Sequence, residues 1–229
     1  MEFKSIYIVY LMIACSIIVG IKSFIKFYMQ SSKRQKYLVK LLHNREIDIF
    51  LKEIDEDIDQ NKETKYRYQL MIYKASGLIV AGRFEESLDL LNKINMDKLP
   101  RELRSVYYYN KISALFYSEL IEEAQIMLRE NLELLRSKMK SDKEKYQIKK
   151  LYAIQEYHTG NFQKSEDIFN KILQHSSNFV ANSICNYYLG LIKLKQEDIE
   201  LSKMYFEKAY DLGQGTFVEN RVKDIFEKL

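Results

Sequence analysis

The chain has 229 residues, of which seven are glycine, one is proline and none is tryptophan, a composition that disfavours a turn-rich β fold and favours long helices. Its two cysteines, Cys15 and Cys185, are too few for a disulfide framework, which favours a reducing compartment. The formal net charge of +4 comes from the N-terminal region, since residues 1–45 hold eight Lys and Arg against one acid. The remainder is slightly acidic, which argues against nucleic-acid binding.

The first segment is an uncharged apolar run of 17 residues that begins at Ser5, and its apolar character continues beyond Lys22 and Lys26 to Tyr28. A helix of about 17 residues spans roughly 26 Å, slightly less than the ~30 Å hydrocarbon core of a bilayer. Lysine side chains can reach the headgroups while their stems stay buried, so the helix can extend to Tyr28. The sequence therefore predicts a transmembrane anchor in residues 1–30.

Basic residues follow this segment rather than precede it. Only Lys4 comes before it, whereas seven Lys and Arg and no acid lie in residues 22–45. The cytoplasmic flank of a membrane helix carries the excess of Lys and Arg. We therefore expect a single-pass protein of a bacterial cytoplasmic membrane, with its N-terminus outside and its body in the cytoplasm.

Two other interpretations of this segment remain open. A cleaved signal peptide needs a basic start and a small-x-small cleavage site, and neither is evident here. The stretch MIAC resembles a bacterial lipobox, although Met12 stands where leucine is usual and an apolar run follows Cys15. We prefer Cys15 as a small apolar residue of a membrane helix. If the topology is inverted, the body becomes an extracytoplasmic assembly factor or a lipoprotein.

The body, residues 31–229, shows a recurring pattern of helix, tight turn and second helix. Four segments look alike, and a weaker copy precedes them: 74–94, 111–131, 151–173 and 187–209, with 38–54 as the weaker copy. The large apolar residues that follow the turns are separated by 37, 37, 41 and 37 residues: Ile47, Phe84, Ile121, Phe162 and Ile199. A recurrence of this length is typical of a helical solenoid.

The pattern inside these segments resembles the tetratricopeptide repeat (TPR) family over roughly residues 33–213. The turn glycine of the family is matched by Gly82 and Gly160. Its small residues, which let two helix backbones approach closely, are matched by Ser87, Ala124, Ser165 and Ser202 in the second helices and by Ala75, Ala153 and Gly190 in the first. Ile112 replaces a small residue, and the tryptophan and the late proline of the family are absent. The resemblance implies a divergent all-α solenoid of about five TPR-like hairpins.

A Gly-rich turn and one amphipathic helix follow the last pair. The apolar residues of this helix are expected to face the array: Phe217, Val218, Val222, Ile225 and Phe226. The ends of a solenoid expose its core and need such a cap. The predicted fold is therefore a transmembrane helix, an α-solenoid and a C-terminal capping helix.

The resemblance to the TPR family also implies a binding site, because the first helices of its repeats line a concave groove that binds peptides. The groove residues implied here are Tyr109, Phe116, Tyr117, Lys150, Tyr157 and Tyr187. Aromatic side chains with polar tips offer a large contact area at a low entropy cost. The expected partner is an apolar peptide or helix, with some acidic character to match Lys150 and Lys195.

No motif for catalysis, for a cofactor or for a metal is evident. The histidines, His43, His158 and His175, lie far apart in the sequence, and no Gly-rich phosphate loop occurs. Cys185 is expected to be a small core residue. We therefore expect a non-enzymatic, membrane-anchored scaffold that binds a membrane-associated protein, with no cofactor, metal, small-molecule substrate or nucleic acid. A peptide-responsive regulator is the alternative.

Overall fold

The computed structural model describes residues 21, 31–33, 35–37, 39–41, 46–137 and 142–228, without the side chains of 142–144. The chain divides into two compact units, residues 1–40 and 41–229. The predicted anchor, from Ser5 to Tyr28, lies outside the described residues except for Ile21, so the anchor and the domain boundary at residue 30 stay predictions. Among the helices that are described, none combines the length and the apolar character needed to cross a bilayer.

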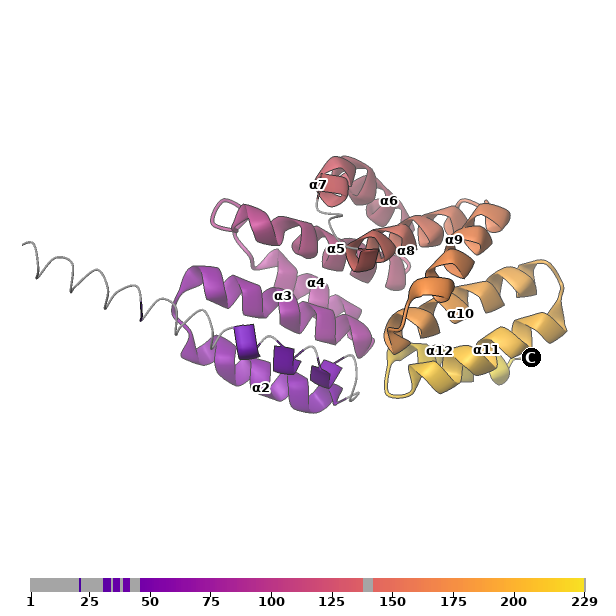
Figure 1. The fold of residues 1–229 in the computed structure, drawn as a ribbon, viewed down its shortest axis with the longest axis horizontal. Helices are drawn as coiled ribbons and strands as arrows, with labels where there is room; N and C mark the ends of the chain where they lie inside the picture. The colour runs from indigo at the N-terminus through magenta and orange to yellow at the C-terminus, as the bar shows by residue number, and fades with distance from the viewer. Residues whose placement is uncertain are drawn as a thin grey trace, which may run out of the picture. The chain divides into compact units, whose positions relative to one another are not determined.

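The second unit is helical throughout its described part, which contains no strand (Figure 1). Its helices are α2 (Ile47–Gln60), α3 (Thr64–Val80), α4 (Phe84–Asn92), α5 (Arg101–Tyr117), α6 (Ile121–Glu130), α7 (Leu132–Ser137), α8 (Asp142–His158), α9 (Phe162–His175), α10 (Phe179–Lys195), α11 (Ile199–Gly213) and α12 (Phe217–Phe226).

Four antiparallel helix pairs account for most of this unit. They are α3 with α4, α5 with α6, α8 with α9, and α10 with α11, and in each pair the two helices lie alongside one another (Figure 1). These pairs confirm the four predicted hairpins. Of the weaker copy at 38–54, the structure describes α2, which packs on α3, while residues 42–45 lie outside the described part. The short α7 lies within the interval whose spacing is 41 instead of 37 residues.

The four pairs share one kind of turn. The second residue after the end of each first helix has a positive φ, and it is Gly82 or Gly160 (φ 81°) in two turns and Glu119 (φ 63°) or Glu197 (φ 61°) in the others. The next residue donates its N–H to the carbonyl five residues back, as in Arg83 to Leu78 at 2.8 Å. This bond caps the orphan carbonyls of the first helix. The family's turn is thus kept even where its glycine is replaced.

The small residues of the repeats form hydrogen bonds as well as close contacts. A serine near the start of the second helix donates to a carbonyl of the first helix in three pairs: Ser87 to Ala75 (3.1 Å), Ser165 to Ala153 (2.7 Å) and Ser202 to Gly190 (2.9 Å). In the remaining pair, Ala124 takes the serine's place and Ile112 stands in the first helix, and both are fully buried. The larger side chain of Ile112 is therefore accommodated because Ala124 lacks the hydroxyl group of the serine.

The C-terminal helix α12 covers the last pair, as predicted, through Phe217, Val218 and Val222, which are buried. Thr216 caps its start by accepting a hydrogen bond from the Val218 N–H at 3.3 Å. Phe226 differs from the prediction, because it is 40% exposed, although its ring makes an edge-to-face contact with Phe206, with centroids 6.3 Å apart. Phe226 lies in the last turn of α12, where the apolar face of the helix extends beyond the end of the array.

Candidate protein-binding groove

The six residues predicted to line the groove lie on the first helices of three successive pairs. Tyr109, Phe116 and Tyr117 come from α5, Lys150 and Tyr157 from α8, and Tyr187 from α10. Tyr109 and Tyr157 are partly exposed, whereas the other four are buried. Their role in binding stays a prediction, and the part that is open to solvent in this conformation is limited to the two tyrosines.

Lys150 is the most unusual of the six because it is a buried cation. Its side chain is 8% exposed, and its Nζ lies 5.9 Å from the centroid of the Tyr109 ring. Burial acts to lower the pKa of Lys150, whereas its interactions with Tyr109, Tyr117 and Cys185 act to raise it, and the net direction is upward. In the described residues no carboxylate lies within ion-pair distance of Lys150.

Two hydroxyl groups of α5 lack hydrogen bonds of ordinary geometry. Tyr117 Oη and Ser113 Oγ, one helical turn apart on α5, are buried and have no hydrogen-bond partner among the described residues. Burial raises the pKa of Tyr117 to about 12, so its phenol is neutral at physiological pH. A buried polar group without a partner is costly, so this part of α5 has unused hydrogen-bonding capacity.

A second cluster connects α8 to α10 through aromatic rings. Tyr188 lies 5.3 Å from Tyr157 and 5.5 Å from Tyr187, measured between ring centroids. His158 stacks on Phe116 at 6.0 Å with nearly parallel planes. Its Nε2 is buried without a hydrogen-bond partner in the described part of the chain, and burial lowers its pKa. The cluster therefore joins α5, α8 and α10 through contacts between aromatic rings.

Helix α12 also contributes to this face of the array. The ring of Phe217 packs against Tyr117 at 4.8 Å and against Phe84, at the start of α4, at 5.2 Å. The guanidinium of Arg221 donates a hydrogen bond to the main-chain carbonyl of Tyr117. These contacts join residues about one hundred positions apart, so the capping helix reaches beyond the pair that it covers.

Sequence reasoning missed Phe84, Tyr188 and Arg221 as parts of this face. Phe84 was identified only as the large residue after a turn, and Tyr188 is the immediate neighbour of a predicted groove residue. The side chains of neighbouring helical residues point about 100° apart, so the repeat pattern does not show that Tyr187 and Tyr188 touch the same cluster. The signal for Arg221 was its place on the amphipathic helix, one turn after Phe217. The predicted core role of Cys185 is confirmed, because this residue is fully buried.

The paired helices, their shared turn and the small residues between them define a TPR domain, a class of protein–protein interaction module. Residues 51–209 match the family described as the SusR N-terminal TPR domain. This match covers more than half of the chain, and the chain belongs to that family. Neither a curated protein nor a solved structure matches it.

Proposed function

We propose that this TPR domain is a membrane-anchored, non-enzymatic scaffold that binds a peptide or helix of a protein partner against α5, α8 and α10. The partner is membrane-associated and meets the domain on the cytoplasmic side of the membrane. Residues 1–30 act as the tether. A tether raises the effective concentration of the domain toward partners at the same surface, without any added contact.

The observation that carries this proposal is the buried ammonium of Lys150. An ammonium taken out of water without a countercharge is expensive, and a carboxylate brought close to it offsets part of that cost. The hydroxyl groups of Ser113 and Tyr117, which have no hydrogen-bond partner in the described residues, lie one turn apart on α5 and add hydrogen-bonding capacity. A partner segment with one acidic residue among apolar ones would satisfy these groups together.

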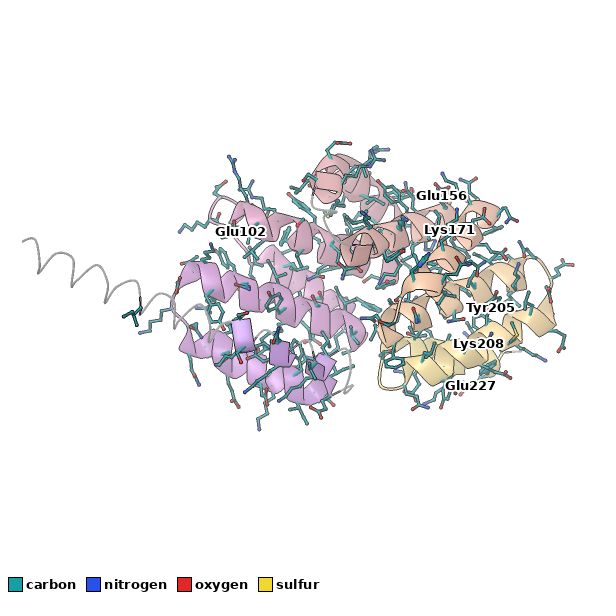
Figure 2. The ribbon with its side chains drawn as sticks, in the orientation of Figure 1. Glu102, Glu156, Lys171, Tyr205, Lys208 and Glu227 are labelled. Atoms are coloured by element: carbon teal, nitrogen blue, oxygen red, sulfur yellow. The ribbon has the colours of Figure 1, made fainter. Side chains whose placement is uncertain are left out.

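The test is site-specific photo-cross-linking in living cells. A benzophenone amino acid replaces Tyr109 or Tyr157, the two partly exposed groove residues, or the exposed Lys171 on α9 (Figure 2) as the position off the groove. We expect the same cross-linked protein from both tyrosine positions and none of it from Lys171. The amount of this cross-linked product should fall at least about tenfold in Lys150→Met, because one charged hydrogen bond corresponds to roughly that factor in a binding constant.

Lys149→Met is the matched control, because Lys149 is the exposed neighbour of Lys150 on the same helix. Lys150→Met should fold, since replacing a buried charge by an apolar side chain of similar size is often neutral or stabilising. A cross-link that forms equally from Lys171, or that persists unchanged in Lys150→Met, would refute binding on this face.

A further inference from the structure

The guanidinium of Arg221 occupies a site that is formed by residues from other parts of the chain. It donates to the carbonyl of Tyr117, the last residue of α5. It also lies over the rings of Phe84, Phe217 and Tyr187, at 5.7, 5.5 and 5.9 Å from their centroids. Aromatic faces attract cations, and the carbonyl end of a helix carries a partial negative charge. The site therefore has the chemistry of a receptor for an arginine side chain.

No carboxylate pairs with Arg221 in the described part of the chain. The carbonyl of Tyr117 is also one of the α5 carbonyls that receive no backbone donor in the described turn, where Leu120 instead bonds to Leu115. Arg221 thus supplies a donor that the helix end would otherwise lack. Another arginine that reached this position would find the same acceptor and the same rings.

Phe217 completes the contact, because it lies one turn before Arg221 and covers Tyr117. Moving Phe217 away would therefore uncover the ring of Tyr117, one of the predicted groove residues. The contacts of α12 therefore bear on access to Tyr117.

We propose that α12 is an intramolecular occupant of the groove, and that the partner is a helix that carries, besides the acidic residue that pairs with Lys150, the same chemistry as α12, an aromatic residue followed one turn later by an arginine. This inference rests on the proposed function and adds its regulation. The partner helix displaces Phe217 and Arg221 and takes over the Tyr117 carbonyl and the surrounding rings. In its absence, α12 keeps the site closed.

The geometry favours a different protein over a second copy of this chain as the source of that helix. Only residues 214–216 connect α11 to α12, a stretch that reaches roughly 10 Å when fully extended. Val218 holds α12 to its own array, since a methyl group added at Gly213 would lie 3.1 Å from its Cβ. Helix α12 can release Phe217 and Arg221, but its linker is too short for an exchange with another copy.

The probe that tests this is a fluorescently labelled synthetic peptide of residues 214–229, titrated into the full-length chain and followed by anisotropy. The wild-type chain should bind it weakly, because its own α12 competes. The variant Phe217→Ala/Arg221→Ala should bind it at least about tenfold more tightly, since a charged hydrogen bond corresponds to roughly 10- to 100-fold in an equilibrium constant. A peptide carrying the same two alanines should bind that variant at least about tenfold more weakly.

Lys223→Ala is the control within the chain, because Lys223 is exposed on α12 and pairs with Glu219 at 2.7 Å. It should bind the peptide as the wild type does. If the double variant loses its helical circular dichroism, Arg221→Lys replaces it in the experiment. This variant keeps the charge but loses the planar fork of the guanidinium, and it should still bind the peptide more tightly than the wild type.

Two results would overturn the proposal. One is that a folded Phe217→Ala/Arg221→Ala or Arg221→Lys variant binds the peptide no more tightly than the wild type does. The other is that the double variant binds both peptides equally. The outcome is separable from that of the cross-linking experiment. Binding of the peptide without any Lys150-dependent cross-link would support the displacement of α12 and refute the scaffold function. Cross-links without any gain in peptide binding would support the function and refute the displacement.

Discussion

Glu197 holds a backbone conformation that glycine holds in the equivalent turns at Gly82 and Gly160. A left-handed conformation costs an L-residue roughly 1–2 kcal/mol, and glycine adopts it freely. We expect Glu197→Gly to raise the free energy of unfolding by about 0.5–1 kcal/mol, measured as a higher urea midpoint with an unchanged slope. Glu200→Gly, in the first turn of α11, should lower it by a similar amount. A loss of stability in Glu197→Gly would contradict this account of the turn.

His158 makes the stability of the domain depend on pH. Burial lowers its pKa in the folded state, Glu119 opposes this shift and Arg221 adds to it. Between the lowered pKa and the ordinary value near 6.5, the unfolded chain therefore binds more protons than the folded one, and stability falls as the pH falls.

The expected result is a loss of unfolding free energy between pH 7 and pH 5 that is smaller in His158→Gln than in the wild type, by up to about 1.4 kcal/mol per unit of pKa shift. The comparison removes the contribution of the carboxylates, which both proteins share. His175→Gln, a substitution at an exposed histidine of α9, is the control for the loss of an imidazole group. Identical pH profiles for the wild type and His158→Gln would show that burial of His158 does not perturb its titration.

At the scale of the helix pair, close packing of α10 on α11 depends on the absence of a side chain at Gly190. A methyl group there would lie 2.6 Å from the Phe206 ring, which is fully buried. Overpacking of this kind costs about 1–3 kcal/mol. We expect Gly190→Ala to lower the thermal midpoint, and the double variant Gly190→Ala/Phe206→Leu to lose less than the sum of the two single variants. Simple additivity would mean that the ring does not limit the approach of the helices.

The helix pairs were also the part of the fold that sequence reasoning predicted best. Small residues such as Ser165 and Ala153 recur at a constant offset of twelve positions, and that offset is a local consequence of one tight turn between two helices. The serine hydrogen bonds to the first helix were not predicted, because a small side chain is expected at a close contact whether or not its hydroxyl is used. The exposure of Phe226 was missed because helical periodicity does not show where the neighbouring helix ends.

At the scale of the whole molecule, the charge distribution around the apolar N-terminus predicts where the TPR domain lies. We expect a cytoplasm-active fluorescent reporter fused after Leu229 to be fluorescent, and alkaline phosphatase fused at the same position to be inactive. The physical reason is the cluster of Lys and Arg in residues 22–45, which favours the cytoplasmic side. Active phosphatase would contradict this topology, and Cys15→Ser would then test whether the chain is a lipoprotein.

The amino-acid sequence by itself determined the helical class, the repeat and its membership of the TPR family, because these follow from the spacing of small and large residues along one or two helices. Only the tertiary structure decided that Lys150 is buried, that Tyr188 links α8 to α10, and that Arg221 meets the carbonyl of Tyr117. Those features join positions from different repeats, up to 104 residues apart. Periodicity carries no information about such pairs, since they depend on how the successive helix pairs stack in space.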